Sequence, residues 1–136
     1  PILSAMARQV ADSRQQTESF IAIEQPELHL HPALAARLAD IFVMAAACSG
    51  HHLKCLILIE THSEHLILRI LRRIRQTTNG DLPEHVPKLL PNDVSVVWVD
   101  NLGKGTTFQR LRIDEQGEFI DRWPRGFFSE RAEELY

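Results

Sequence analysis

The sequence predicts an α/β fold, in which a largely parallel sheet is flanked by helices and followed by an antiparallel hairpin. Two continuous apolar runs of strand length, residues 20–23 and 53–59, predict the buried strands of this sheet. The segment between them has apolar residues at helical spacing. Because a helical crossover joins parallel strands, both runs should end at the same edge of the sheet.

Three amphipathic segments are predicted to be helices. The first spans residues 2–16, with apolar positions at Ile2, Leu3, Met6 and Val10. The second begins at Pro32, whose missing N–H suits a first turn, and ends near residues 49–50. Its predicted apolar stripe is Leu34, Leu38, Ile41, Phe42 and Ala45. The third follows Ser63 as N-cap, and its stripe is Leu66, Ile67, Ile70, Leu71 and Ile74.

The C-terminal third of the sequence predicts a different architecture. A loop is expected over residues 77–92, and strands over 94–99 and 106–113 form an antiparallel hairpin. A turn at 115–118, a short edge strand at 119–120 and a closing helix at 127–136 are expected to follow. We therefore divide the chain into residues 1–92, the main α/β part, and residues 93–136, a C-terminal extension.

Composition excludes several classes of protein. With 44% hydrophobic and 24% charged residues, the 136 residues have the balance of one ordinary globular domain. No run reaches the about 18 apolar residues that a membrane helix needs, and the first residues lack a signal-peptide layout, so the expected location is the cytoplasm. The chain starts at Pro1 within a helical pattern, and we expect it to be a piece of a longer protein.

Two polar residues stand where the apolar runs end. Glu24 follows the first run directly, and a carboxylate in that position is typical of residues that orient waters around magnesium at nucleotide phosphates. His62 follows the second run at the same predicted edge, which predicts that its imidazole lies beside the carboxylate of Glu24. The plain alternatives are that Glu24 caps the next turn and that His62 is a structural histidine.

The segments IEQPELHLHP and LIETHSEHL together resemble the second half of the nucleotide-binding core in ABC-type ATPases of the SMC, RecF and OLD-like group. The closing FIDRWPRGFFSERAEELY resembles the small C-terminal domain of unknown function in some bacterial AAA-type ATPases. The resemblance implies a partial P-loop NTPase-like lobe and a role in DNA repair or phage defence.

The resemblance also implies roles for individual residues. Glu24 takes the place of the magnesium-coordinating Asp, Gln25 that of the catalytic Glu, and His62 that of the histidine that contacts the γ-phosphate. The residues where two subunits would meet around ATP are Leu28, His29, Leu30, His31 and Pro32. The implied cofactors are ATP and Mg²⁺, and the implied partners are a second copy of the chain, an effector protein and DNA.

Two departures from the family pattern bear on activity. The amide of Gln25 can orient a water but has no basic site for its proton, so slow hydrolysis, or Glu27 as the base, follows as a hypothesis. The chain contains no GxxxxGK[ST] phosphate loop, and residues 103–105 are only a short echo of one. We therefore expect this chain alone to be inactive and to bind ATP weakly.

Other classes of function remain open at this point. A non-hydrolysing module could use the same fold for dimerisation or for binding nucleic acid, with Arg69, Arg72 and Arg73 gripping phosphates. A solvated helix face is the simpler explanation of these arginines. A metal-dependent nuclease would draw on a set of acidic and imidazole side chains, Glu24, Glu27, His29, His31 and His62.

Overall fold

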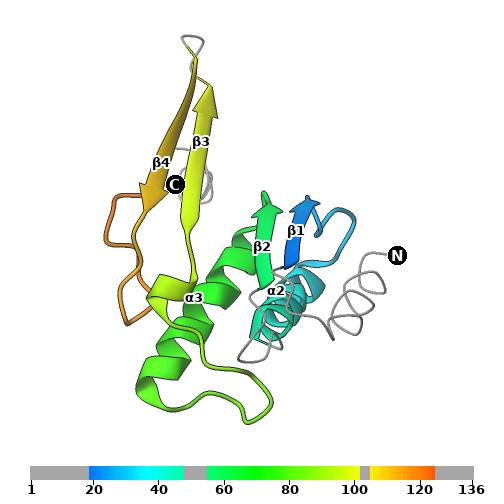
Figure 1. Ribbon diagram of the computed structural model, residues 1–136, viewed down its shortest axis with the longest axis vertical. Coiled ribbons are helices and arrows are strands. Elements are labelled where there is room, and N and C mark those ends of the chain that lie inside the picture. Colours follow the sequence, from blue (N-terminus) through cyan, green and yellow to red (C-terminus); the bar gives the residue numbers. More distant parts are fainter. Residues whose placement is uncertain (1–18, 48–54, 102–104, 125–136) are drawn as a thin grey trace, which may run out of the picture. The chain divides into compact units, whose positions relative to one another are not determined.

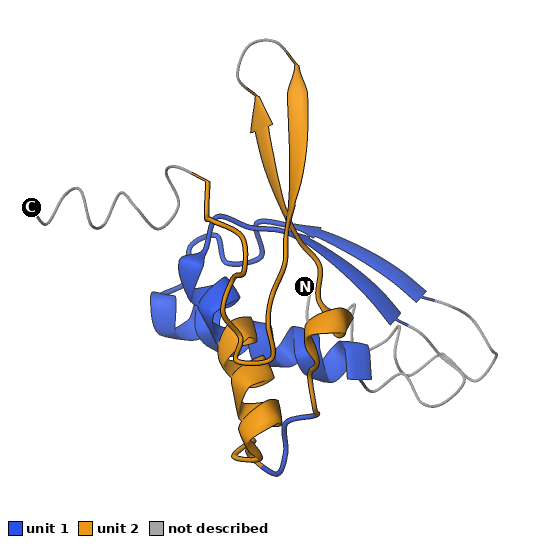
Figure 2. Cartoon of the chain, turned by 90° about the vertical axis from the view of Figure 1, so that its left-hand side faces the viewer, with its two compact units in different colours: residues 1–69, 84–87 blue, residues 70–83, 88–136 orange. Residues whose placement is uncertain are grey.

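The computed structural model describes residues 19–47, 55–101 and 105–124 (Figure 1). The predicted helices at 2–16 and 127–136 lie outside these residues. The chain divides into two compact units, residues 1–69 with 84–87 and residues 70–83 with 88–136 (Figure 2). The predicted boundary between residues 92 and 93 stays a prediction.

The first unit is built on a parallel pair of strands, as predicted. Strand β1 (Ser19–Glu24) pairs with β2 (Cys55–Glu60) in a register that begins at Ser19 opposite Cys55 (Figure 1). The register ends with Glu24 opposite Glu60. The two strands therefore finish level with each other, and the segments that follow start from the same edge of the sheet.

Helix α2 (Pro32–Ala47) begins at Pro32 as predicted, and residues 48–50, where its end was expected, are outside the described part. The backbone N–H groups of Leu34 and Ala35 donate to the carbonyl of His31. The predicted stripe needs a correction, because Leu34 is exposed. The small side chains of alanine take part in the buried face, which consists of Ala35, Leu38, Ala39, Phe42 and Val43.

The strands are less buried than their continuous apolar sequence predicts. Burial alternates along β1 and β2, and the side chains of Phe20, Leu56 and Leu58 are more than half exposed on one face. Parallel sheets are normally covered on both faces, which is why such strands read as unbroken apolar runs. Within the described ranges, nothing covers this face of the pair.

Helix α3 (Glu64–Asn79) starts as predicted and ends later than predicted. The hydroxyl of Ser63 accepts from the backbone N–H of Leu66 at 3.3 Å, which confirms the N-cap. The predicted loop from residue 77 is wrong at its start, because the helix continues until Gly80 adopts a φ of 74°. The N–H of Asp81 then donates to the carbonyl of Gln76 at 3.1 Å, the bond that closes a glycine-ended helix.

The second unit contains the predicted antiparallel hairpin (Figure 1). After a short 3-10 helix, Pro91–Asp93, strand β3 (Val96–Asn101) pairs with β4 (Thr106–Leu111). The hairpin is shifted relative to the prediction, since β3 starts two residues later and β4 ends at Leu111. The predicted edge strand is reduced to one bridge between Ile113 and Phe119.

The loop after β4 packs directly on helix α3 within the second unit. Arg75 donates to the carbonyl of Gln116 at 2.7 Å and forms an ion pair with Glu118. Thr78 donates to the carbonyl of Glu115 at 2.7 Å. Gly117 has a φ of 66°, and a Cβ added there would lie 2.1 Å from the carbonyl oxygen of Leu71. The loop can lie this close only because position 117 has no side chain.

Aromatic rings close this unit. The ring of Trp123 contacts Trp98 edge to face, with 6.1 Å between centroids, and Phe119 with 4.7 Å. Asp121, which lies between Phe119 and Trp123 in the sequence, forms a bidentate ion pair with Arg112. The distance from Nη2 of Arg112 to Oδ1 of Asp121 is 2.7 Å. The segment that follows β4 is therefore fixed by both apolar and charged contacts.

No helix in the described ranges has the length and apolar character to cross a membrane.

The first prediction tests the close approach of Gly117 to α3. Gly117→Ala should lower the free energy of unfolding by about 2 kcal/mol or more, because the added methyl meets a helix carbonyl and φ is positive. Gly80→Ala is the matched control, since Gly80 also has positive φ but has open space around its Cβ position. Denaturant unfolding followed by circular dichroism should show the larger loss at 117; equal losses would contradict the packing.

The second prediction concerns pH. The hydrogen bonds from Arg112 lower the pKa of Asp121 from 3.8 to about 2. Because the folded pKa is depressed, the ion pair stabilises the protein above pH 3.8, and this stabilisation is lost as pH falls through about 2. Carboxyl NMR titration should show the low pKa, and Arg112→Ala should raise it toward the ordinary value. An unchanged titration in that variant would show that Arg112 is not the cause.

Candidate functional site

The carboxyl ends of β1 and β2 bring two carboxylates together. Glu24 and Glu60 are register partners, so their side chains emerge on the same face of the sheet, and both residues are exposed. Sequence reasoning singled out Glu24 and missed Glu60. The signal was present, because Glu60 ends the second apolar run just as Glu24 ends the first.

The turn after β1 has an unusual backbone. Gln25 and His29 have φ values of 43° and 66°, in the left-handed region that favours glycine. Each such residue costs about 1–2 kcal/mol. Within the turn, Leu28 N–H donates to the carbonyl of Gln25 at 3.1 Å, and Leu30 N–H donates to that of Glu27 at 2.8 Å. These bonds close the turn but leave its strain to be offset elsewhere.

Hydrogen bonds to the end of β2 hold this turn in place. The N–H of Gln25 donates to the carbonyl of Glu60 at 2.8 Å. One carboxylate oxygen of Glu27, Oε1, accepts from the hydroxyl of Thr61 at 2.7 Å and from the N–H of His62 at 2.9 Å. Bonds to a charged acceptor contribute about 1.5–3 kcal/mol each, which is enough to offset the turn's strain.

The network continues from Thr61 into helix α3. The hydroxyl oxygen of Thr61 accepts from the N–H of Ser63 at 3.0 Å, and Ser63 in turn caps the helix. The second oxygen of Glu27, Oε2, is buried and has no hydrogen-bond partner within the described residues. Thr61 was not predicted as a site residue, because its contact with Glu27 depends on the register of the two strands.

His62 lies at this edge, as predicted from its place after the second apolar run. Its backbone N–H is fixed by Glu27, and the residue is exposed. The structure thus brings Gln25, Glu27 and His62 together with the paired carboxylates. The predicted placement of the imidazole directly beside Glu24 stays a prediction.

The segment predicted to meet a second subunit lies on the surface. Residues 28–32 are all exposed, and the apolar side chains of Leu28 and Leu30 are 60% and 40% exposed. His31 has a local role, since its Nδ1 accepts from the N–H of Ala33 at 3.3 Å at the start of α2. Among the residues that the structure describes, no group of three or more His, Cys, Asp or Glu side chains is placed to hold a metal ion.

The three arginines predicted to contact nucleic acid have different surroundings. Arg69 lies 3.7 Å from a carboxylate oxygen of Asp40, and its side chain is mostly buried. Arg73 is only 5% exposed and donates to Gln76 at 2.6 Å. Arg72 is exposed. The three side chains therefore do not share one solvated surface.

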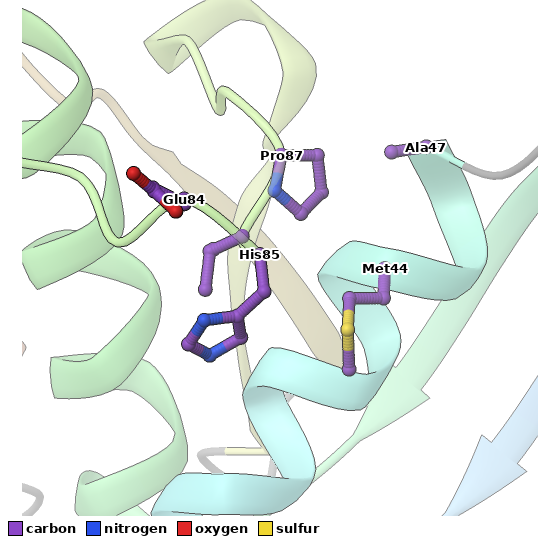
Figure 3. A pocket seen from close by; sticks show the side chains of 6 residues that line it. Met44, Ala47, Glu84, His85 and Pro87 are labelled. Atoms are coloured by element: carbon purple, nitrogen blue, oxygen red, sulfur yellow. The ribbon is translucent and has the colours of Figure 1, made fainter.

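A shallow apolar hollow lies in the first unit, lined by Met44, Ala47, Glu84, His85, Val86 and Pro87 (Figure 3). None of these residues is one of the predicted site residues. The polar edge at the ends of β1 and β2 is therefore the stronger candidate for a functional site.

One family model matches part of the chain. Residues 2–67, which are 66 of the 136 residues, match the model of a family described as AAA ATPase domain. Neither the curated proteins nor the solved structures gave a match. The matched segment contains both strands, the turn after β1 and the loop that carries His62. Residues 2–67, just under half of the chain, are therefore similar to an AAA ATPase domain.

Proposed function

We propose that this chain supplies the magnesium-binding and switch residues of an ATPase that hydrolyses ATP between two subunits. The observation that carries the proposal is the joining of the two loops, in which Gln25 and Glu27 of the first are hydrogen-bonded to residues 60–62 of the second. The match to an AAA ATPase domain, which implies nucleotide binding, supports it. We assign the phosphate-binding loop to polypeptide outside these 136 residues.

The donor set at the sheet edge fits magnesium. Mg²⁺ takes oxygen ligands, and in nucleotide sites it uses one or two protein carboxylates together with waters and phosphates. Glu24 would hold the ion through a water, and Glu60 stands beside it in the register. When bound, the ion would neutralise negative charge on the nucleotide phosphates.

The remaining residues have separate roles in this proposal. Gln25 orients the attacking water through its amide, and His62 donates to the charge that develops on the transferred phosphoryl group. Glu27 is the acidic side chain of this turn, and its use as the base is the alternative to Gln25 acting by orientation alone. Its Oε1 already accepts two hydrogen bonds and its Oε2 is buried, which favours a role in holding the loops together over proton transfer.

Two exposed apolar surfaces support assembly with further polypeptide. Leu28 and Leu30 project from the segment that we propose as the contact between subunits. The uncovered face of Phe20, Leu56 and Leu58 is what the remaining part of an ATPase domain would cover. Closing and opening of two such subunits would then gate an effector in DNA repair or phage defence.

The third prediction tests turnover in the full-length protein that contains this chain. His62→Ala should reduce kcat by about 100-fold or more, because a donor to the transferred group is lost. His85→Ala is the matched control, since His85 is also exposed but lies outside the site, and it should keep wild-type turnover. ATP hydrolysis with magnesium is measured for each variant and for the isolated 136-residue chain.

The outcomes separate the candidate functions. Turnover in the full-length protein, its loss in His62→Ala and no turnover in the isolated chain would support the split site. A full-length protein that neither binds nor hydrolyses ATP would contradict the proposal. The function as a non-hydrolysing dimerisation module would then be favoured, because the amide of Gln25 has no basic site for a proton.

The fourth prediction concerns the paired carboxylates. Glu24→Gln should raise the Mg²⁺ concentration needed for half-maximal turnover by about tenfold or more, because a charged ligand is lost. Glu60→Gln should raise it less, since Glu60 only adds negative charge beside the ion. Glu84→Gln is the control for removal of a surface charge. Equal Mg²⁺ requirements in all four proteins would argue against magnesium at this edge.

A further inference from the structure

Glu27 lies where the two loops of the site meet. Its Oε1 accepts from the Thr61 hydroxyl and from the His62 N–H, so one atom holds both the side chain of Thr61 and the backbone of His62. These are the only side-chain bonds between the two loops within the described residues. The position of His62 therefore depends directly on where the turn places Glu27.

We propose that Glu27 is a positioning residue, which couples the conformation of the turn after β1 to the position of His62. The proposal rests on the function assigned above and adds a regulation to it. The turn leads into Leu28–Pro32, the proposed contact with a second copy of the chain. Association of two subunits thereby sets the placement of His62, and turnover depends on that association.

The backbone of the turn suits this role. Its start is held on β2 through the N–H of Gln25 and the carbonyl of Glu60 at 2.8 Å, whereas its far end, from Leu28 onward, is exposed. Positive φ values at Gln25 and His29 bracket the segment that contains Glu27. Strained positions of this kind persist only while their surroundings hold them. A partner that covers the exposed end changes those surroundings.

The effect of Glu27 also reaches helix α3. The Thr61 hydroxyl donates to Glu27 and accepts from the N–H of Ser63, which caps the helix. A displacement of Glu27 thus moves a short chain of hydrogen bonds, and not a single contact. In the sequence, His62 lies between Thr61 and Ser63, two members of this series of hydrogen bonds.

Substitutions distinguish positioning from proton transfer. Glu27→Gln keeps a carbonyl oxygen that can accept from Thr61 and His62 but cannot act as a base, whereas Glu27→Ala removes both capacities. Thr61→Val removes one donor at nearly constant shape, and Thr61→Ser restores the hydroxyl. A positioning role predicts large effects of Glu27→Ala and Thr61→Val, and recovery in Glu27→Gln and Thr61→Ser.

The first measurement is independent of ATP chemistry. Hydrogen–deuterium exchange of the full-length protein should show the amide of His62 exchanging about tenfold faster or more in Glu27→Ala, since its hydrogen bond is lost. Glu27→Gln should recover much of the protection, and Glu84→Ala, a control at an exposed glutamate, should match the wild type. Unchanged exchange in Glu27→Ala would overturn the proposal even if the protein is an active ATPase.

The second measurement follows turnover against protein concentration, with dimer formation monitored by sedimentation. In the wild type, turnover per subunit should rise as dimers form. In Glu27→Ala, compared at concentrations where sedimentation shows the same fraction of dimer, KM for ATP should change little and kcat should be about tenfold lower without the rise. A rise that persists in Glu27→Ala would overturn the link between association and His62.

A different pattern would assign Glu27 to chemistry. Loss of turnover in Glu27→Gln as severe as in Glu27→Ala, with Thr61→Val as active as Thr61→Ser, would make Glu27 the base and overturn the positioning role. A wild type without any turnover would refute the proposed function, and the exchange experiment would then still decide whether Glu27 places His62.

Discussion

Two hydrogen bonds to a single oxygen of Glu27 connect the parts of the candidate site. They join the turn after β1 to the loop after β2, and through Thr61 they extend to the cap of α3. The turn has two non-glycine residues with positive φ, so it needs contacts of this strength to keep its shape. The parallel register supplies them, because it ends both strands at the same level.

The same register explains why the sheet edge is acidic and the sheet face apolar. Alternation along each strand puts Glu24 and Glu60 on the face that also carries Phe20, Leu56 and Leu58. Like charges at opposite positions of two strands destabilise the pair. Apolar side chains that stay exposed to water contribute no stabilisation by burial. The charge repulsion is removed if a cation lies between the two carboxylates, as proposed above, and the apolar face is removed from water if further protein covers it.

Local patterns in the sequence predicted the elements well, and contacts between elements poorly. Strand runs, the N-cap at Ser63 and the start of α2 at Pro32 follow from neighbouring residues, and the structure confirms them. The end of α3 was missed because threonines at 77 and 78 read as loop, although Gly80 decides the stop. The bond from Thr61 to Glu27 spans 34 residues, so only the strand register reveals it.

The aromatic contacts of the second unit have a spectroscopic consequence. The chain has two tryptophans, Trp98 and Trp123, and their rings touch each other within the unit that holds the hairpin. Intrinsic fluorescence excited at the indole band therefore originates entirely from that unit. The parallel strands and the candidate site emit no such signal, so a fluorophore introduced near them would be needed to observe that half of the molecule.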